Sequence, residues 1–174
     1  TSETKINIFG KKLFRIKALI SFGDVEAGET GGWVEKEGNV NQSGDAWVSG
    51  DAEVSGDARV FGNAMVSGNA MVSGNARVFG DAEVSGNAEV SGDARVFGDA
   101  MVSGNADYTT IHGFGTQFRT TTFFRCKDKK VRVACGCFFG TIPEFREQVK
   151  NTRKGKIAEE YLMIADLMEK HFEK

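Results

Sequence analysis

Small apolar residues recur at alternate positions within a six-residue unit through the middle of the chain. From Gly44 to Thr109 the sequence reads as eleven consecutive units of the form Gly-[Asp/Asn]-Ala-x-Val-x, and Tyr108 replaces Val only in the last unit. Ala and Val stand two positions apart, so both point to the same side of a strand. Gly followed by Asp or Asn favours a turn, because these residues tolerate the left-handed backbone region. Each unit is therefore predicted to form one short strand and one corner.

A second period of 18 residues is superimposed on the first. It relates two sets of residues, Arg59, Arg77 and Arg95, and Phe61, Phe79 and Phe97. Three units per turn would place each set in one column on one face of a solenoid. Ala and Val flank each Arg and point inward, so the Arg side chains are expected to point outward. The Phe side chains, two positions further on, are expected to point outward or toward the corner.

The segments on either side of the repeat predict a cap and an appendage. Residues 5–20 alternate around a turn and predict a hairpin that covers the first coil, with Trp33 and Trp47 sealing that end. Residues 123–126 and 131–135 predict a second hairpin. Thr141 is expected to cap a helix with Pro143 in its first turn, and an apolar stripe predicts another helix over 157–172. The expected divisions are an N-terminal cap with an irregular first coil at 1–43, the repeat at 44–109 and the appendage at 110–174.

The repeat resembles the hexapeptide repeat of left-handed parallel β-helices. The resemblance implies a mainly β fold with three hexapeptides per coil, an N-terminal β cap and a small C-terminal α+β appendage. The flanks resemble a hexapeptide-repeat family common in temperate phages and prophages, through LFRIKAL at 13–19, GETGGWVEKEGN at 28–39, TTTFFRCKD at 120–128 and CGCFFGTIPEF at 135–145. That family resemblance implies no established activity. It does imply the cytoplasm of an infected or lysogenic bacterium as the setting.

Composition restricts the classes of protein further. The chain has 174 residues, and no run approaches the ~20 apolar residues of a membrane-spanning helix. Its first seven residues are mostly polar and contain no apolar secretory segment. Three Cys exclude a disulfide framework and fit a reducing cytoplasm. We therefore expect a cytoplasmic protein without a membrane partner.

Charge is distributed unevenly along the chain. Residues 44–107 carry 3 basic and 10 acidic side chains, and residues 108–174 carry 13 and 8. An acidic rod could imitate a nucleic-acid backbone, but Asp and Asn alternate freely at the corners, which favours turn chemistry. The basic segment contains Lys127, Lys129, Lys130 and Arg132. Phosphate contact is one interpretation of it, and a solvated loop is favoured.

The Arg and Phe columns are the main candidate binding surface, because an exposed apolar ladder marks an interface. Three coverings stay open for it: the chain's own C-terminal helices, a second copy of the chain in a homo-oligomer, and a foreign protein. A column of Thr, as in ice-binding β-helices, is absent from the outward positions.

Cys and His residues offer two weaker hypotheses. Cys126, Cys135 and Cys137 together with His112 have the residue types of a zinc site, but their spacing matches no usual ligand pattern, so free thiols and no cofactor are expected. Hexapeptide acyltransferases use a His as general base, which makes His112 the weak catalytic candidate. The units also lack the long insertions that wall the acyl-donor cleft in that class.

The sequence therefore favours a non-enzymatic binding protein of phage type. A specific form of this hypothesis is an inhibitor of a bacterial defence protein such as a CRISPR nuclease. The alternatives are a hexapeptide-class acyltransferase and a self-assembling structural component.

Overall fold

The computed structural model describes residues 1–173. The chain divides into two compact units, Thr1–Asn105 and Ala106–Lys174. The first unit is a parallel β-solenoid of about four turns with an antiparallel hairpin at its N-terminal end. The second unit is an antiparallel sheet with two helices. The predicted mainly β architecture is confirmed, with a small helical part at the C-terminal end.

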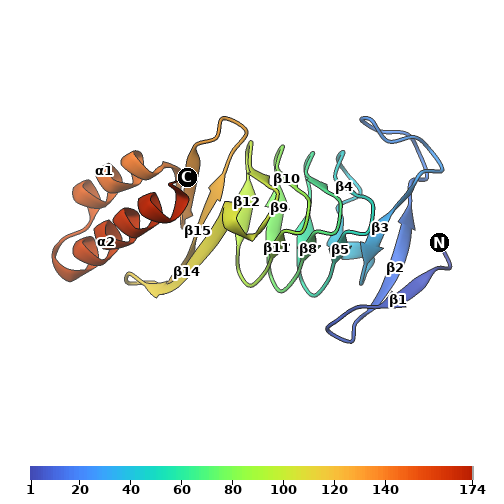
Figure 1. The fold of residues 1–174 in the computed structure, drawn as a ribbon, viewed down its shortest axis with the longest axis horizontal. Helices are drawn as coiled ribbons and strands as arrows, with labels where there is room; N and C mark the ends of the chain where they lie inside the picture. Colours follow the sequence, from blue (N-terminus) through green and yellow to red (C-terminus); the bar gives the residue numbers. More distant parts are fainter. Residues whose placement is uncertain (174) are drawn as a thin grey trace. The chain divides into compact units, whose positions relative to one another are not determined.

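The coils of the solenoid stack as three parallel sheets (Figure 1). The first sheet contains β3 (Thr30–Val34), β5 (Glu53–Val54), β8 (Met71–Val72) and β11 (Glu89–Val90). The second contains β4 (Trp47–Val48), β7 (Met65–Val66), β10 (Glu83–Val84) and β13 (Met101–Val102). The third contains β6 (Arg59–Val60), β9 (Arg77–Phe79) and β12 (Arg95–Phe97). Within the repeat, consecutive members of each sheet pair with a shift of 18 residues, as the second period predicts, while β3 and β5 pair with a shift of 20. The left-handed sense of the coil stays a prediction.

Small residues fill the interior of the solenoid. Every Ala and Val of the repeat from Ala52 to Val102 has no solvent-exposed surface. The corners need glycine because the backbone there is left-handed and lies against the next coil. At Gly80 φ is +71°, and a Cβ atom would lie 3.0 Å from the Gly98 nitrogen. Amide side chains bridge successive corners, for example from Asn75 Nδ2 to Asp93 Oδ1 at 2.9 Å.

The N-terminal end of the solenoid is closed by an antiparallel extension of the first sheet. Strands β1 (Thr4–Ile6) and β2 (Lys12–Lys17) form the expected hairpin, and β2 pairs with β3. Trp47 is buried against Ala18 and Val25. A 3₁₀ turn, η1 (Glu37–Asn39), follows β3, and the buried Asn39 amide donates to the carbonyl oxygens of Gly56 and Ala58.

Glu35 links this cap to the second coil, and it should make stability depend on pH. Its carboxylate accepts hydrogen bonds from the Gly56 N–H at 2.6 Å and from Lys11 Nζ at 3.1 Å. These contacts lower the pKa of Glu35 below its ordinary value of 4.5, with the Gly56 bond as the largest cause. A lowered pKa in the folded state stabilises the protein above the unfolded-state pKa, and the gain is lost as pH falls through the folded-state pKa.

We therefore expect Glu35→Gln to lower the free energy of unfolding at pH 7 by about 1–2 kcal/mol. The difference from the unsubstituted protein should be constant above pH 4.5 and shrink below it, as urea unfolding at several pH values would measure. Glu26→Gln is the matched control, because Glu26 is exposed. A difference that grows toward acid pH would contradict the assignment.

The repeat ends one unit earlier than the sequence pattern predicts. Residues Asn105–Asp107 form a 3₁₀ turn, η2, in place of a corner and strand. Tyr108 then begins β14 (Tyr108–Phe114), which pairs antiparallel with β15 (Arg119–Arg125). The physical reason is local: Tyr108 replaces the small Val that the interior of a coil accommodates.

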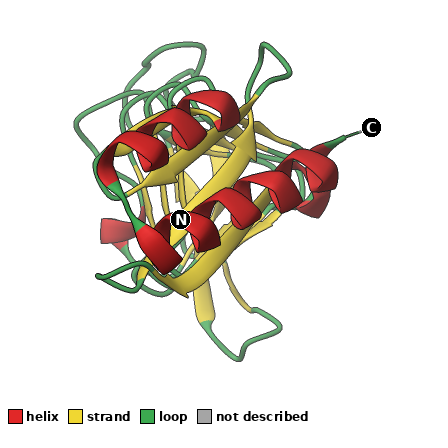
Figure 2. Cartoon of the chain, turned by 90° about the vertical axis from the view of Figure 1, so that its left-hand side faces the viewer, coloured by secondary structure: helices red, strands yellow, loops and turns green. Residues whose placement is uncertain are grey.

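The second unit is built on the antiparallel sheet β14–β15–β16–β17, in which β16 spans Val131–Cys135 and β17 spans Phe138–Thr141. Helices α1 (Ile142–Thr152) and α2 (Gly155–Phe172) lie side by side over strands (Figure 2). Thr141 caps α1 through its hydroxyl, and Glu144 completes a capping box, as the sequence predicts. No helix within residues 1–173 is long and apolar enough to cross a membrane.

Candidate functional site

The third sheet of the solenoid carries the two predicted columns on one outward surface. We call this surface the Arg/Phe face and define it by Arg59, Arg77, Arg95, Phe61, Phe79 and Phe97. Strands β6, β9 and β12 pair in register, so each Arg lies beside the next Arg. The three Phe rings form a stack with centroid separations of 4.7 Å and interplanar angles of 3° and 4°. The 18-residue period thus creates a continuous aromatic ladder.

The Arg and Phe columns differ in solvent exposure. The three Phe rings are half-buried, while Arg59 and Arg77 are exposed. Arg95 is half-buried, and its guanidinium carbon lies 5.9 Å from the Phe79 ring centroid and 5.7 Å from that of Phe97. These distances allow a cation–π attraction. The face therefore presents the edges of stacked rings bordered by positive charge.

Two hollows adjoin this face. One, of about 600 Å³, lies beside Phe61 and Arg59 and is also bordered by Asn41 and Gln42. The other, of about 450 Å³, lies along Arg59 and Arg77 and has Asp57 and Asp93 on its lining. The Arg column thus has carboxylates nearby. The Lys36 ammonium bonds Asp57 at 2.6 Å and holds the pKa of that carboxyl below its ordinary value.

The C-terminal helices use their apolar stripes within their own unit. Residues of α2 such as Ile164, Met168 and Phe172 pack in one cluster with Phe123 and Val133 of the sheet. The stripe that favoured covering of the ladder by these helices is therefore already buried against another partner.

The predicted basic residues lie in the second unit, at the turn between β15 and β16. Lys127, Lys129 and Lys130 are exposed. Arg132 is half-buried, and its Nη2 bonds Asp128 Oδ2 at 2.7 Å. This bond is the main reason that the pKa of Asp128 lies below its ordinary value. Arg132 is therefore already paired with a carboxylate.

The predicted thiol and imidazole groups differ in solvent exposure. Cys126 is buried, Cys135 half-buried and Cys137 exposed, and within residues 1–173 none of the three forms a disulfide. Within residues 1–173 no three His, Cys, Asp or Glu side chains are grouped so as to hold a metal ion. His112 is exposed on β14, with Nδ1 3.2 Å from Thr120 Oγ1. A neutral hydroxyl does not stabilise an imidazolium as a carboxylate does, so this contact adds no support for general-base catalysis.

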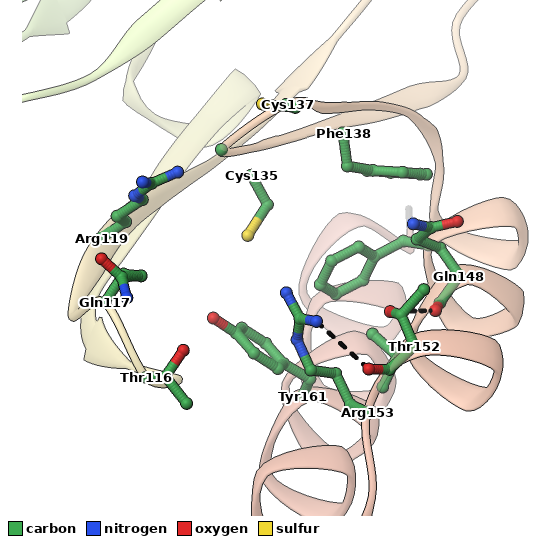
Figure 3. Close-up of a pocket in the computed structure, with 13 residues that line it drawn as sticks. Thr116, Gln117, Arg119, Cys135, Cys137, Phe138, Gln148, Thr152, Arg153 and Tyr161 are labelled. Carbon is green, nitrogen blue, oxygen red and sulfur yellow. Dashed lines mark hydrogen bonds between the residues drawn. The ribbon is translucent and has the colours of Figure 1, made fainter.

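A cavity in the second unit was missed by sequence reasoning. It has a volume of about 230 Å³ and is bordered by the loop after β14, the β16–β17 turn, and α1 with the start of α2 (Figure 3). Arg119 and Arg153 both border it, but they are 34 positions apart and share no pattern in the sequence. No local signal could have paired them.

Tyr161 forms part of the inner wall of this cavity. Its hydroxyl donates to the Phe114 carbonyl oxygen at 3.3 Å. Burial raises the pKa of Tyr161, and the neighbouring Cys135 adds to the effect. The phenol is therefore protonated and able to donate at neutral pH.

Comparison with known proteins supports the repeat and no more than the repeat. A family model described as the YdcK beta-solenoid repeat matches residues 52–68, 58–73 and 64–80 in overlapping stretches. A search of curated proteins finds no match. The stretches 52–68 and 58–73 contain Arg59 and Phe61, and the stretch 64–80 contains Arg77 and Phe79. The chain is thus similar to YdcK-type solenoid repeats over residues 52–80, and this fold is compatible with a non-enzymatic binding or structural module.

Proposed function

We propose that this protein is a non-enzymatic binding module of phage type whose docking surface is the Arg/Phe face. The observation that carries the proposal is the stack of Phe61, Phe79 and Phe97, with successive ring centroids 4.7 Å apart, along the third sheet of the solenoid. In the other units these outward positions carry Ser, or Thr109 in the last unit. Aromatic and Arg side chains are the residue types enriched where binding energy concentrates at interfaces.

The solenoid supports this role by holding the face rigid. Its interior is filled by Ala and Val, and its corners are joined by amide bridges such as Asn63 to Asp81 at 3.0 Å. A surface that is ordered before binding loses little conformational entropy when a partner docks. The partner expected for such a face has an apolar centre and a border of carboxylates opposite Arg59 and Arg77.

The specific partner we propose is a bacterial defence protein, such as a CRISPR nuclease, that the module inhibits by occupying its surface. The resemblance of the flanks to a phage and prophage family motivates this choice. Inhibition by docking needs no catalytic residues, which agrees with the environment of His112.

The test compares Phe79→Asp with Met71→Asp. Met71 lies on the first sheet and also points outward, so the control adds the same charge to another face. Each protein is immobilised and exposed to lysates of bacteria rich in defence systems, and captured proteins are identified by mass spectrometry. We expect one stoichiometric nuclease with the unsubstituted protein and with Met71→Asp, and at least about a thirtyfold loss of affinity with Phe79→Asp, as for a central interface residue.

The inhibition step is then measured with the purified nuclease. DNA cleavage should fall as the unsubstituted protein is added, and Phe79→Asp should not inhibit. Equal capture by all three proteins would exclude the Arg/Phe face. A larger particle in light scattering that Phe79→Asp dissociates, without a captured nuclease, would assign the face to self-association instead.

A further inference from the structure

The cavity of the second unit has the chemistry of an anion-binding site. Two guanidinium groups, those of Arg119 and Arg153, border it, and none of its described lining residues is Asp or Glu. The other polar groups on the lining are amides, hydroxyls and thiols, and the hydroxyls and amides can donate hydrogen bonds. The lining therefore carries a net positive charge and a surplus of donors.

The two arginines approach the cavity from different elements. Arg119 begins β15, and Arg153 follows the last residue of α1 (Figure 3). Within residues 1–173 neither forms an ion pair with a carboxylate, and Arg153 Nη1 donates only to the adjacent Thr152 carbonyl at 3.2 Å. Glu160 is the acidic residue whose charge acts on Tyr161. Its Oε1 atom lies 3.6 Å from Lys156 Nζ, so this carboxylate is paired with a lysine. Both guanidinium groups therefore keep donors for a ligand.

A glycine allows one of these groups to lie against the backbone. A Cβ atom at Gly136 would be 3.1 Å from Arg119 Nη1, closer than ordinary contact. The residue also has φ of +60°, which disfavours other side chains. The absence of a side chain at Gly136 thus allows the Arg119 guanidinium to pack against the backbone at the rim of the cavity.

The inner wall of the cavity is apolar and aromatic. Phe145, Val149 and Tyr161 are buried, and Phe138 is half-buried. The rings of Phe138 and Phe145 have centroids 5.4 Å apart. An apolar wall with charged groups at the mouth is the usual design of a small-molecule site.

We propose that this cavity binds a small organic anion. Its carboxylate or phosphate group lies between the guanidinium groups of Arg119 and Arg153, and its apolar body packs on Phe138 and Phe145. Guanidinium groups bind both kinds of oxyanion through paired N–H donors. The volume of about 230 Å³ is below the ~300–1,000 Å³ of drug-sized pockets, which selects a ligand of the size of a single substituted ring.

The experiment titrates the full chain by calorimetry with four probes: benzoate, phenyl phosphate, inorganic phosphate and the neutral benzyl alcohol. The variants are Arg119→Gln and Arg153→Gln, both at exposed positions, so the fold should be retained and circular dichroism verifies it. Lys170→Gln removes one exposed positive charge on α2 outside the cavity and is the matched control. As a second readout, ligand should protect the Cys135 thiol, which lines the cavity, from alkylation in the unsubstituted protein and in Lys170→Gln, and protect it less in Arg119→Gln and Arg153→Gln.

We expect benzoate or phenyl phosphate to bind, each arginine substitution to weaken binding about tenfold or more, and Lys170→Gln to leave it unchanged. The tighter of the two probes identifies the head group. Equal binding of benzyl alcohol would overturn the role of charge, and equal binding of inorganic phosphate would overturn the role of the aromatic wall. No binding of either organic anion at millimolar concentration would overturn the proposal, and it would leave the function proposed for the Arg/Phe face untouched.

Discussion

Gly86→Ala is expected to destabilise the solenoid much more than Gly92→Ala. Both residues are corner glycines with left-handed backbones, at φ of +61° and +66°. A Cβ atom in that conformation costs roughly 1–2 kcal/mol at either position. The two corners differ in what the Cβ would meet: at Gly86 it would lie 2.3 Å from the Ser103 carbonyl oxygen, and at Gly92 it would have no atom within 4 Å.

The contact at Gly86 cannot be relieved by turning a side chain, because the atom in the way belongs to the backbone of the next coil. Overpacking of this kind adds roughly 1–3 kcal/mol. The free energy of unfolding should therefore fall by about 2–5 kcal/mol in Gly86→Ala and by only about 1–2 kcal/mol in Gly92→Ala. Urea unfolding followed by circular dichroism measures both values. Equal losses would show that the coil spacing at Ser103 adapts freely, contrary to the close stacking described above.

Phe145→Ala is expected to cause the largest loss of stability in the second unit. The Phe145 ring is buried and lies edge-on to Phe123 and Tyr161, with centroid separations of 6.3 and 5.7 Å. It joins helix α1 to both the sheet and α2, so its removal leaves a cavity at the point where three elements meet. Truncation of a buried Phe costs about 3–5 kcal/mol.

Hydrogen exchange of residues 106–173 measures this effect directly. Phe118→Ala is the matched control, because that ring is 67% exposed and its loss should cost under about 0.5 kcal/mol. The two Trp residues, Trp33 and Trp47, both lie in the first unit, so their fluorescence reports the solenoid separately. We expect faster exchange in the second unit with an unchanged urea midpoint for Trp fluorescence. Unchanged exchange in Phe145→Ala would contradict the packing described here.

The two proposed sites differ in how far the sequence could predict them. The Arg/Phe face follows from arithmetic, because an 18-residue period in a coil of 18 residues must return each side chain to the same column. The cavity depends on Arg119, at the start of a strand, and Arg153, at the end of a helix, bordering the same space, and no period relates them. A local pattern identifies a site only where a repeat converts sequence spacing into spatial proximity.

The flanks illustrate the same contrast on a smaller scale. The cap at Thr141 and the hairpin of β15 and β16 were predicted, because capping and alternation are local signals. Strands β14 and β17 were missed. β17 is a run of Phe, Gly and Thr without alternation, and β14 carries a bulge between Ile111 and Phe114 that interrupts its register. The role of the buried Asn39 was missed as well, because its amide donates to carbonyl groups of the second coil, which are distant in the sequence.

The sequence by itself determined the solenoid, its three repeat units per turn, the outward position of the Arg and Phe sets, and the capped helix. Each of these depends on residues within one period of one another, where alternation, glycine at corners and capping chemistry act locally. The tertiary structure alone decided where the coil ends, which surface the C-terminal helices cover and which groups enclose the cavity. Those features depend on contacts between residues far apart in the chain, whose free energy is gained only when separate elements pack against each other.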